Sequence, residues 1–156
     1  MNSAGIWERE IGAERTFMND KVFLDSNIIV YAYDRHDPEK LAKAQSLLKS
    51  GIAQDCAVVS SQVLGEFFVV VTQRIKEPLS ADEAMEIIEI LSVLQVAEID
   101  LALVKRAIET HKIYGISYWD SLIVAAAERT GCHKLVSEDL NDGQEYNGIV
   151  VENPFR

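Results

Sequence analysis

Four acidic residues of this sequence stand where carboxylates are uncommon. Asp25 and Asp139 each follow a short apolar segment of strand-like composition, whereas Glu66 and Asp120 interrupt helical segments that are apolar on nearly every side. A carboxylate is rarely buried unless it is paired or binds a metal, because removing an isolated charge from water is costly. We therefore expect these four side chains to share one site.

Each acid also has a structural interpretation when it is taken alone. Asp120 lies three residues after Ser117 and could bond back to the start of its helix, and Glu66 could pair with Arg74. The other two acids could serve in an Asx turn and in an ordinary loop. Four such coincidences are less expected than one shared site.

The residue types predict a hard cation at that site. Carboxylates with few histidines and without closely spaced thiols select Mg²⁺ or Mn²⁺ over zinc or copper. His36, His111 and His133 show no paired spacing, which argues against histidine-based RNA cleavage. Cys56 and Cys132 lie far apart in the sequence, which fits a reducing compartment and gives no zinc ribbon.

Strand-like and helical segments alternate along the chain, which predicts an α/β fold with a mainly parallel five-stranded sheet and helices on both faces. In such sheets ligands bind beyond the carboxyl ends of the strands, where two of the four acids are expected. The polar segment 138–148 is expected to be a loop. The expected strands are 21–24, 56–59, 96–99, 134–137 and 149–151, and the helices lie near 28–33, 38–50, 61–75, 81–91, 101–114 and 118–130.

Length and charge limit the class of protein. The 156 residues fit one domain, placed at 21–156 after an extension of unknown role at 1–20. A net charge of −10 excludes a broadly basic nucleic-acid-binding surface, so any phosphate contact must be local. The longest apolar run, 67–71, is too short to cross a bilayer, and the N-terminus has no signal-peptide core. We therefore expect a cytoplasmic protein that does not enter a membrane.

Several motifs, in their order along the chain, resemble the PIN-domain ribonucleases, and especially the VapC toxins of bacterial and archaeal toxin–antitoxin pairs. They are VFLDSNI at 22–28, Glu66 in its apolar helix, SYWDSLIVAAA at 117–127 and SEDLNDG at 137–143. The resemblance extends from about residue 22 to residue 155. It implies a PIN-like three-layer sandwich and a Mg²⁺- or Mn²⁺-dependent endoribonuclease.

Carried over residue by residue, the resemblance assigns catalytic and metal-binding roles to the four acids and supporting roles to small polar residues beside them. Such a metal would polarise a phosphodiester and lower the pKa of a bound water, giving 5′-phosphate and 3′-hydroxyl products. The assigned acids are Asp25, Glu66, Asp120 and Asp139, with Asp142 as a less favoured substitute for the last, and the supporting residues are Ser26, Asn27 and Ser117.

The resemblance also implies partners: an RNA substrate, a small antitoxin whose C-terminal segment wraps the toxin, and a second copy of the chain in a homodimer. The acidic surface would suit a basic antitoxin segment. The RNA target differs among family members and is set by loops outside the acidic motifs. The basic residues that are candidates for contacts with the RNA backbone are Arg74, Lys76 and Lys112, and also Lys21, Lys105 and Arg106, although for each a solubilising role is the simpler interpretation.

Two other functions remain as alternatives. A phosphatase of haloacid dehalogenase type would need a second Asp two residues after Asp25, where the sequence has Asn27. A non-catalytic PIN-like module that binds RNA or protein would have no need of all four acids. We interpret Tyr118 and Trp119 as core residues rather than as a surface on which RNA bases stack.

Overall fold

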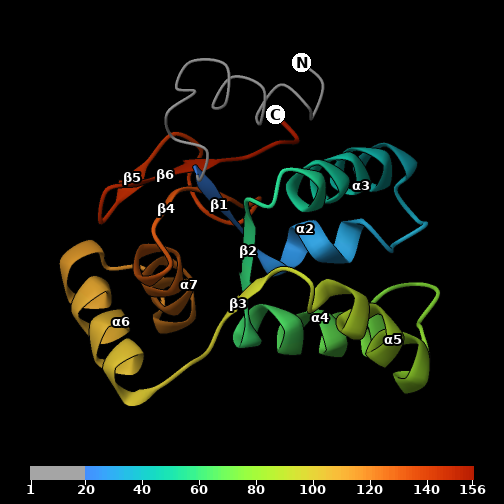
Figure 1. Ribbon diagram of the computed structural model, residues 1–156, viewed down its shortest axis with the longest axis horizontal. Coiled ribbons are helices and arrows are strands. Elements are labelled where there is room, and N and C mark those ends of the chain that lie inside the picture. Colours follow the sequence, from blue (N-terminus) through green and yellow to red (C-terminus); the bar gives the residue numbers. More distant parts are fainter. Residues whose placement is uncertain (1–19) are drawn as a thin grey trace.

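The computed structural model describes residues 20–156, whose strands form one six-stranded sheet in the order β3-β2-β1-β4-β6-β5 (Figure 1). All neighbouring strands are parallel except β5 and β6, which are antiparallel. Residues 1–19, nearly all of the expected extension, lie outside the described part. The strands are β1 (Lys21–Leu24), β2 (Ala57–Ser60), β3 (Gln95–Ala97), β4 (Cys132–Val136), β5 (Glu145–Tyr146) and β6 (Ile149–Glu152).

Six helices in the described residues cover both faces of the sheet, which confirms the expected α/β sandwich. Figure 1 shows α6 and α7 on one side of β1 and β2, and α2 and α3 on the other. No helix within residues 20–156 is long and apolar enough to cross a membrane. The helices are α2 (Ser26–Tyr31), α3 (Pro38–Ala53), α4 (Ser61–Gln73), α5 (Ala81–Leu91), α6 (Leu101–Tyr114) and α7 (Tyr118–Arg129).

The prediction of five strands was wrong by one, because the expected loop at 138–148 contains the short strand β5. Asn147 and Gly148 both have positive φ, 51° and 81°, so they form the kind of tight turn that joins β5 to β6 in a hairpin. Tyr146 is buried and its ring meets that of Tyr114 edge-on at 5.1 Å. The Asn-Gly pair was the sequence signal for this hairpin, but its polar surroundings obscured it.

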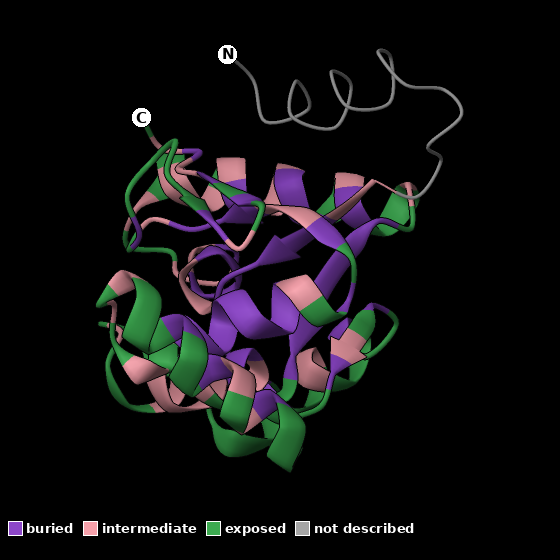
Figure 2. Cartoon of the chain, turned by 90° about the vertical axis from the view of Figure 1, so that its left-hand side faces the viewer, coloured by how far each residue is buried: buried purple, intermediate pink, exposed green. Residues whose placement is uncertain are grey.

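Strand β1 lies at the centre of the sheet and of the hydrophobic core. Val22, Phe23 and Leu24 are completely buried, which Figure 2 shows as the continuous buried interior. Burial of each such side chain stabilises the fold by roughly 1.5–3 kcal/mol. The chain winds in one direction from β1 to β2 and returns past β1 to β4, so the crevice for ligands opens at the carboxyl ends of β1 and β4.

Local sequence signals fix the helices that flank this crevice. Ser60 caps α4, where its side chain accepts a hydrogen bond from the Val63 amide at 3.2 Å. Helix α6 ends at Gly115, whose φ of 70° lets the chain turn into α7. Residues 121–127 of α7 are all buried, so this helix is held against the sheet and its first turn reaches the crevice.

Two glycine substitutions test this account of the helices. Gly115→Ala should lower the free energy of unfolding by about 1–2 kcal/mol, because a side chain is strained at positive φ. Gly65→Ala is the matched control: Gly65 lies inside α4, has open space around it and should gain about 0.5–1 kcal/mol. Urea unfolding of both variants measures these changes, and a shift of the same sign in both would contradict the assigned backbone geometry.

Candidate active site

Asp25 is the first residue after β1 and lies buried at the edge of the crevice. Its backbone amide still pairs with the β4 carbonyl of Val136 at 3.0 Å, which fixes its position in the sheet. Carboxylate Oδ1 accepts a hydrogen bond from the Ser26 amide at 2.7 Å, and Oδ2 accepts one from the Ser137 hydroxyl at 2.6 Å. The side chain is therefore held by the start of α2 on one side and by the end of β4 on the other.

Ser137 connects Asp25 to Asp139. Its hydroxyl donates to Asp25 and accepts from the backbone amide of Asp139 at 3.1 Å, and the residue is completely buried. Reasoning from the sequence assigned no role to Ser137. The signal was present, because a buried serine directly after β4 and two residues before an acid stands at the same sheet edge as Asp25.

Asn27 makes a second connection between the same two acids. Its amide Nδ2 donates to Asp139 Oδ2 at 3.1 Å and makes a weaker contact with Asp25 Oδ2 at 3.4 Å. Its Oδ1 accepts from the Glu138 amide at 3.2 Å. Asn27 thus fastens the loop after β4 onto α2, which is a position suited to the supporting role expected for it.

Lys40 of α3 holds the same loop from outside. Its ammonium group forms an ion pair with Glu138, donates to the Tyr31 hydroxyl at 3.2 Å and lies 4.6 Å from the centre of the Tyr31 ring. The Phe155 ring centre is 5.2 Å from the same nitrogen. This contact could not be predicted from the sequence, because Lys40 and Glu138 lie far apart along the chain.

Glu66 reaches the crevice from α4. The Ser26 hydroxyl donates to its Oε2 at 2.8 Å, and the amide of Gln62, one helical turn earlier, donates to its Oε1 at 2.8 Å. The same Gln62 nitrogen donates to the carbonyl of Trp119 at 3.2 Å. Gln62 was not expected in the site, yet it joins Glu66 to the first turn of α7.

Asp120 lies in that first turn and is half-buried. Ser117 caps α7 by accepting a hydrogen bond from the Asp120 amide at 3.1 Å, so the serine does support this acid, through the backbone. Hydrogen bonds run from Asp139 through Asn27 and Ser137 to Asp25, and from Ser26 to Glu66. Asp120 is connected to them through the backbone of Trp119, which Gln62 contacts, and through the charges of Glu66 and Asp139. The structure therefore brings all four expected acids to one crevice.

The electrostatics of the crevice show that the acids act on one another. Burial, with smaller contributions from the charges of Asp139 and Glu66, raises the pKa of Asp25 to about 6, although hydrogen bonds from Ser137 and Ser26 oppose the rise. Burial also raises the pKa of Asp120, and the charges of Asp139 and Glu66 add to that effect. A site that resists ionisation in this way favours a bound cation.

The donor set fits a divalent metal in its chemistry. Within residues 20–156, none of the four carboxylates forms an ion pair with a lysine or arginine, so no described basic side chain neutralises their charge. All of them are hard oxygen donors, as Mg²⁺ and Mn²⁺ prefer. Among the described residues, no group of three or more His, Cys, Asp and Glu side chains is already arranged to hold a metal, and oxygens of Asp25, Glu66 and Asp139 accept hydrogen bonds from neutral side chains.

Asp142, the expected substitute for Asp139, lies apart from this network. Its Oδ1 accepts a hydrogen bond from the Asn153 amide at 2.8 Å, and the residue is exposed. This hydrogen bond joins the loop before β5 to the C-terminal segment after β6. Of the two acids, Asp139 is the one whose side chain contacts the other site residues.

The candidate RNA-binding residues differ in where they lie. Arg74, at the C-terminal end of α4, and Lys76 and Lys112 are exposed. Lys21 begins β1 and is therefore at the opposite edge of the sheet from the acids. Arg106 forms an ion pair with Glu128 that links α6 to α7, so its charge is already partnered.

The interpretation of Tyr118 and Trp119 as core residues was right for the first and wrong for the second. Tyr118 is partly buried and packs against the core. Trp119 is 62% exposed. The reason is its place at the start of the helix: the residues of α7 from Ser121 to Ala127 are buried on every side, whereas Trp119, in the turn before them, is not covered by the core.

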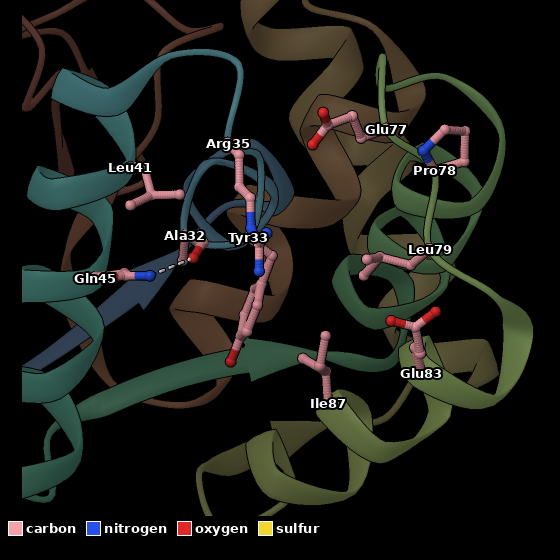
Figure 3. Close-up of a pocket in the computed structure, with 10 residues that line it drawn as sticks. All are labelled: Ala32, Tyr33, Arg35, Leu41, Gln45, Glu77, Pro78, Leu79, Glu83 and Ile87. Carbon is pink, nitrogen blue, oxygen red and sulfur yellow. Dashed lines mark hydrogen bonds between the residues drawn. The ribbon is translucent and has the colours of Figure 1, made fainter.

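A separate hollow of about 370 Å³ lies at the far end of α2 and contains none of the four acids (Figure 3). Figure 3 shows Tyr33, Leu41, Leu79 and Ile87 around it, with Glu77 and Glu83 at its rim. A bond from Gln45 to the carbonyl of Ala32, 2.9 Å long, ties α3 to α2 at its floor. Arg35 also lines the hollow, so apolar side chains, one basic residue and two acidic residues share its surface.

A PIN domain family profile matches residues 22–141, and the chain therefore belongs to the PIN domain family. That range contains Asp25, Glu66, Asp120 and Asp139. PIN domains are typically nucleases and generally use a divalent metal. A comparison with curated proteins finds no match.

Solved structures with a similar fold are VapC toxins and their complexes. VapC20 of Mycobacterium tuberculosis, a toxin that cleaves the sarcin–ricin loop, has a TM-score of 0.62 and 20% identity over 83% of this chain and 99% of that one. A toxin–antitoxin complex from Klebsiella pneumoniae has a TM-score of 0.63 and 17% identity, and the match covers 86% of this chain and 98% of that one. VapBC2 from Rickettsia felis, bound to a promoter DNA fragment, has a TM-score of 0.60 and 22% identity. The match covers 85% of this chain and 97% of that one. At these identities the likeness shows the fold.

The raised pKa of Asp25 predicts how stability depends on pH in the presence of chelator. The folded protein holds this proton more tightly than the unfolded chain, so the free energy of unfolding should fall as pH rises from near 4 to about 6 and then level off. Asp25→Asn should remove this fall and stabilise the metal-free protein at pH 7 by up to about 3 kcal/mol. Urea unfolding of both proteins from pH 4 to pH 8 measures the free energy of unfolding and its dependence on pH.

Asp142→Asn is the matched control for that experiment, because it also removes one acid but lies outside the network. It should keep the pH profile of the original protein. An Asp25→Asn variant with the same pH dependence as the control would show that Asp25 is not held in a charged, buried cluster.

Proposed function

We propose that the protein is a metal-dependent endoribonuclease that acts as the toxin of a toxin–antitoxin pair. The observation that carries this proposal is the network at the carboxyl ends of β1 and β4, where four acids are linked and unneutralised by any described lysine or arginine. Membership in the PIN domain family and the VapC-like fold support it. The proposed domain is residues 21–156.

The residues that would hold Mg²⁺ or Mn²⁺ are Asp25, Glu66, Asp120 and Asp139. The metal, when bound, supplies polarisation of a phosphodiester and a lower pKa for water, which suits hydrolysis to a 5′-phosphate and a 3′-hydroxyl. The chain itself orients these acids. Ser137 and Asn27 fix the pair at the sheet edge, and their hydrogen bonds to Asp25 keep its reactive side chain in one rotamer.

Protein groups also restrict where the phosphodiester can lie. Ser26 and Gln62 use the two oxygens of Glu66, which leaves this acid oriented from α4 toward α2. Asp120 comes from the start of α7 and Asp139 from the loop after β4, and the charge of Asp139 acts on Asp120, so we infer that the substrate phosphate lies near both. The acids would repel that phosphate in the absence of metal, so we expect RNA binding as well as cleavage to require the cation.

A haloacid-dehalogenase-type phosphatase is a poorer fit. Its second acid would stand at position 27, and here Asn27 uses its amide to donate to Asp139. A non-catalytic binding module would have no requirement for a buried acid, Asp25, beside further acids whose charges repel it and lower stability. Such a module is the outcome if the protein binds RNA without cutting it.

The proposed antitoxin would seat a basic and partly apolar segment in the hollow beside Tyr33. Leu41, Leu79 and Ile87 would contact the apolar side chains of such a segment, and Glu77 and Glu83, which outnumber Arg35 in the lining, would attract its basic ones. Helix α2, only six residues long, spans roughly 9 Å from this hollow to Asp25, so a bound segment can extend along it and cover the acids. Leu41→Lys should release a co-expressed antitoxin while metal-dependent RNA cleavage continues; retention of the antitoxin by this variant would exclude the hollow.

A homodimer is proposed from the resemblance to VapC toxins and from exposed apolar side chains on α5, α6 and the segment between them. Monomeric proteins rarely leave a large apolar patch in water. Ile90, Val93 and Leu101 are each more than 60% exposed. Sedimentation equilibrium should give twice the chain mass of 17.4 kDa.

The function is tested by cleavage of a labelled, structured RNA pool. The purified protein should cut it in Mg²⁺ or Mn²⁺ and stop in chelator, and Asp120→Asn should lower the rate by at least about a hundredfold, since loss of an electrostatic group in the reacting centre has effects of this size. Asp142→Asn is the control and should cleave at the original rate, because Asp142 contacts only the loop before β5.

Two outcomes of this experiment contradict the proposal. Cleavage that persists in chelator or in Asp120→Asn would come from a contaminating nuclease or from different chemistry. Binding of RNA without cleavage in either metal, from protein shown to be free of antitoxin, would favour the binding module.

A further inference from the structure

Trp119 is a large aromatic side chain that the fold leaves in water beside the acids. It is 62% exposed, although indole is among the side chains that gain most from burial. It directly precedes Asp120 in the first turn of α7. An aromatic ring in such a place has no role in the core of this chain.

Contacts of the Trp119 backbone and of the neighbouring Tyr118 ring hold the indole in place. The carbonyl of Trp119 accepts a hydrogen bond at 3.2 Å from Gln62, whose amide nitrogen also donates to Glu66 at 2.8 Å. The Tyr118 ring meets the indole edge-on, with ring centres 5.0 Å apart and planes at 77°. Tyr118 is itself packed against the core. The indole is therefore exposed but braced, and its backbone is tied to an acid of the site.

The charge of the site explains why a stacking surface is needed there. The protein carries a net charge of −10, and the four acids have no cationic partner among the described residues. One or two bound metals neutralise only the immediate phosphate, so neighbouring nucleotides gain little from electrostatic attraction. Stacking of a base on an aromatic ring does not depend on protein charge and contributes substantially to binding of single strands.

We propose that Trp119 is the platform on which an unpaired base of the RNA substrate stacks, next to the phosphodiester held at Asp120 and Asp139. This inference rests on the proposed ribonuclease function and adds to it a residue that binds a base, which must be unpaired because a paired base cannot present its face to the indole. Trp119 is a binding residue and carries no proton or metal.

The first test measures the fluorescence of Trp119 directly. The sequence has two tryptophans, so Trp7→Phe in the full chain leaves Trp119 as the sole reporter. A random-sequence single-stranded RNA of about ten nucleotides should quench its emission in Mn²⁺. The same RNA annealed to its complement has the same charge per strand and should quench it far less.

The second test measures cleavage of the RNA pool by two variants. Trp119→Ala should raise the half-saturating RNA concentration roughly five- to a hundredfold while the rate at saturation stays within a few fold. Trp119→Phe keeps an aromatic face and should recover most of the loss. The exposed position predicts that neither substitution lowers the melting temperature by more than a few degrees.

The outcomes separate this inference from the proposed function. Normal cleavage by Trp119→Ala together with no quenching by single-stranded RNA would overturn the stacking role and leave the ribonuclease intact. Quenching without cleavage by any variant would support the stacking role and reject the ribonuclease. Equal quenching by single-stranded and duplex RNA, or conversion of the protein to a monomer by Trp119→Ala, would also overturn the proposal, the latter by assigning the indole to a protein interface.

Discussion

The structure depends on the confinement of like charges at one edge of a parallel sheet. Asp25 is buried where β1 ends, and Glu66, Asp120 and Asp139 face the same crevice from α4, α7 and the loop after β4. Burial and mutual repulsion both disfavour this arrangement, as the pKa of about 6 for Asp25 shows. The hydrogen bonds that Asp25 accepts from the Ser137 hydroxyl and the Ser26 amide offset part of this cost. That strain is the property a divalent cation would relieve, and it connects the stability of the fold to its proposed chemistry.

Small polar side chains hold the acids in defined orientations. Ser137 and Asn27 hold the acids of the sheet edge, while Ser26 and Gln62 orient Glu66 and, through the carbonyl of Trp119, the first turn of α7. None of these four residues carries a charge, so they orient the carboxylates without neutralising them. The negative charge stays available for a metal, and the exposed indole of Trp119 is proposed to give the RNA a contact that the acidic surface cannot supply.

The sequence predicted the parallel sheet, the helices on both faces and the acids that meet at its edge. Periodicity and capping residues carry that information locally, and strands that run parallel bring their carboxyl ends together. It did not predict β5, because a two-residue strand among polar residues has no periodicity. It also missed Ser137, Gln62 and Lys40 as contacts of the site, because hydrogen bonds between residues far apart in the chain leave no local pattern. Trp119 was misplaced because the apolar run that starts at Leu122 gives no sign that burial of the helix begins only after Asp120.

The most direct test of the central claim is calorimetric titration of the metal-free protein with Mn²⁺, repeated with Glu66→Gln. Glu66 is the informative position because it comes from α4, far in sequence from the other three acids, and joins them only if the crevice is one site. The account predicts saturable binding to the original protein and an affinity weakened by roughly tenfold or more in the variant. Equal Mn²⁺ affinity in the two proteins, or no binding to either, would contradict a shared metal site.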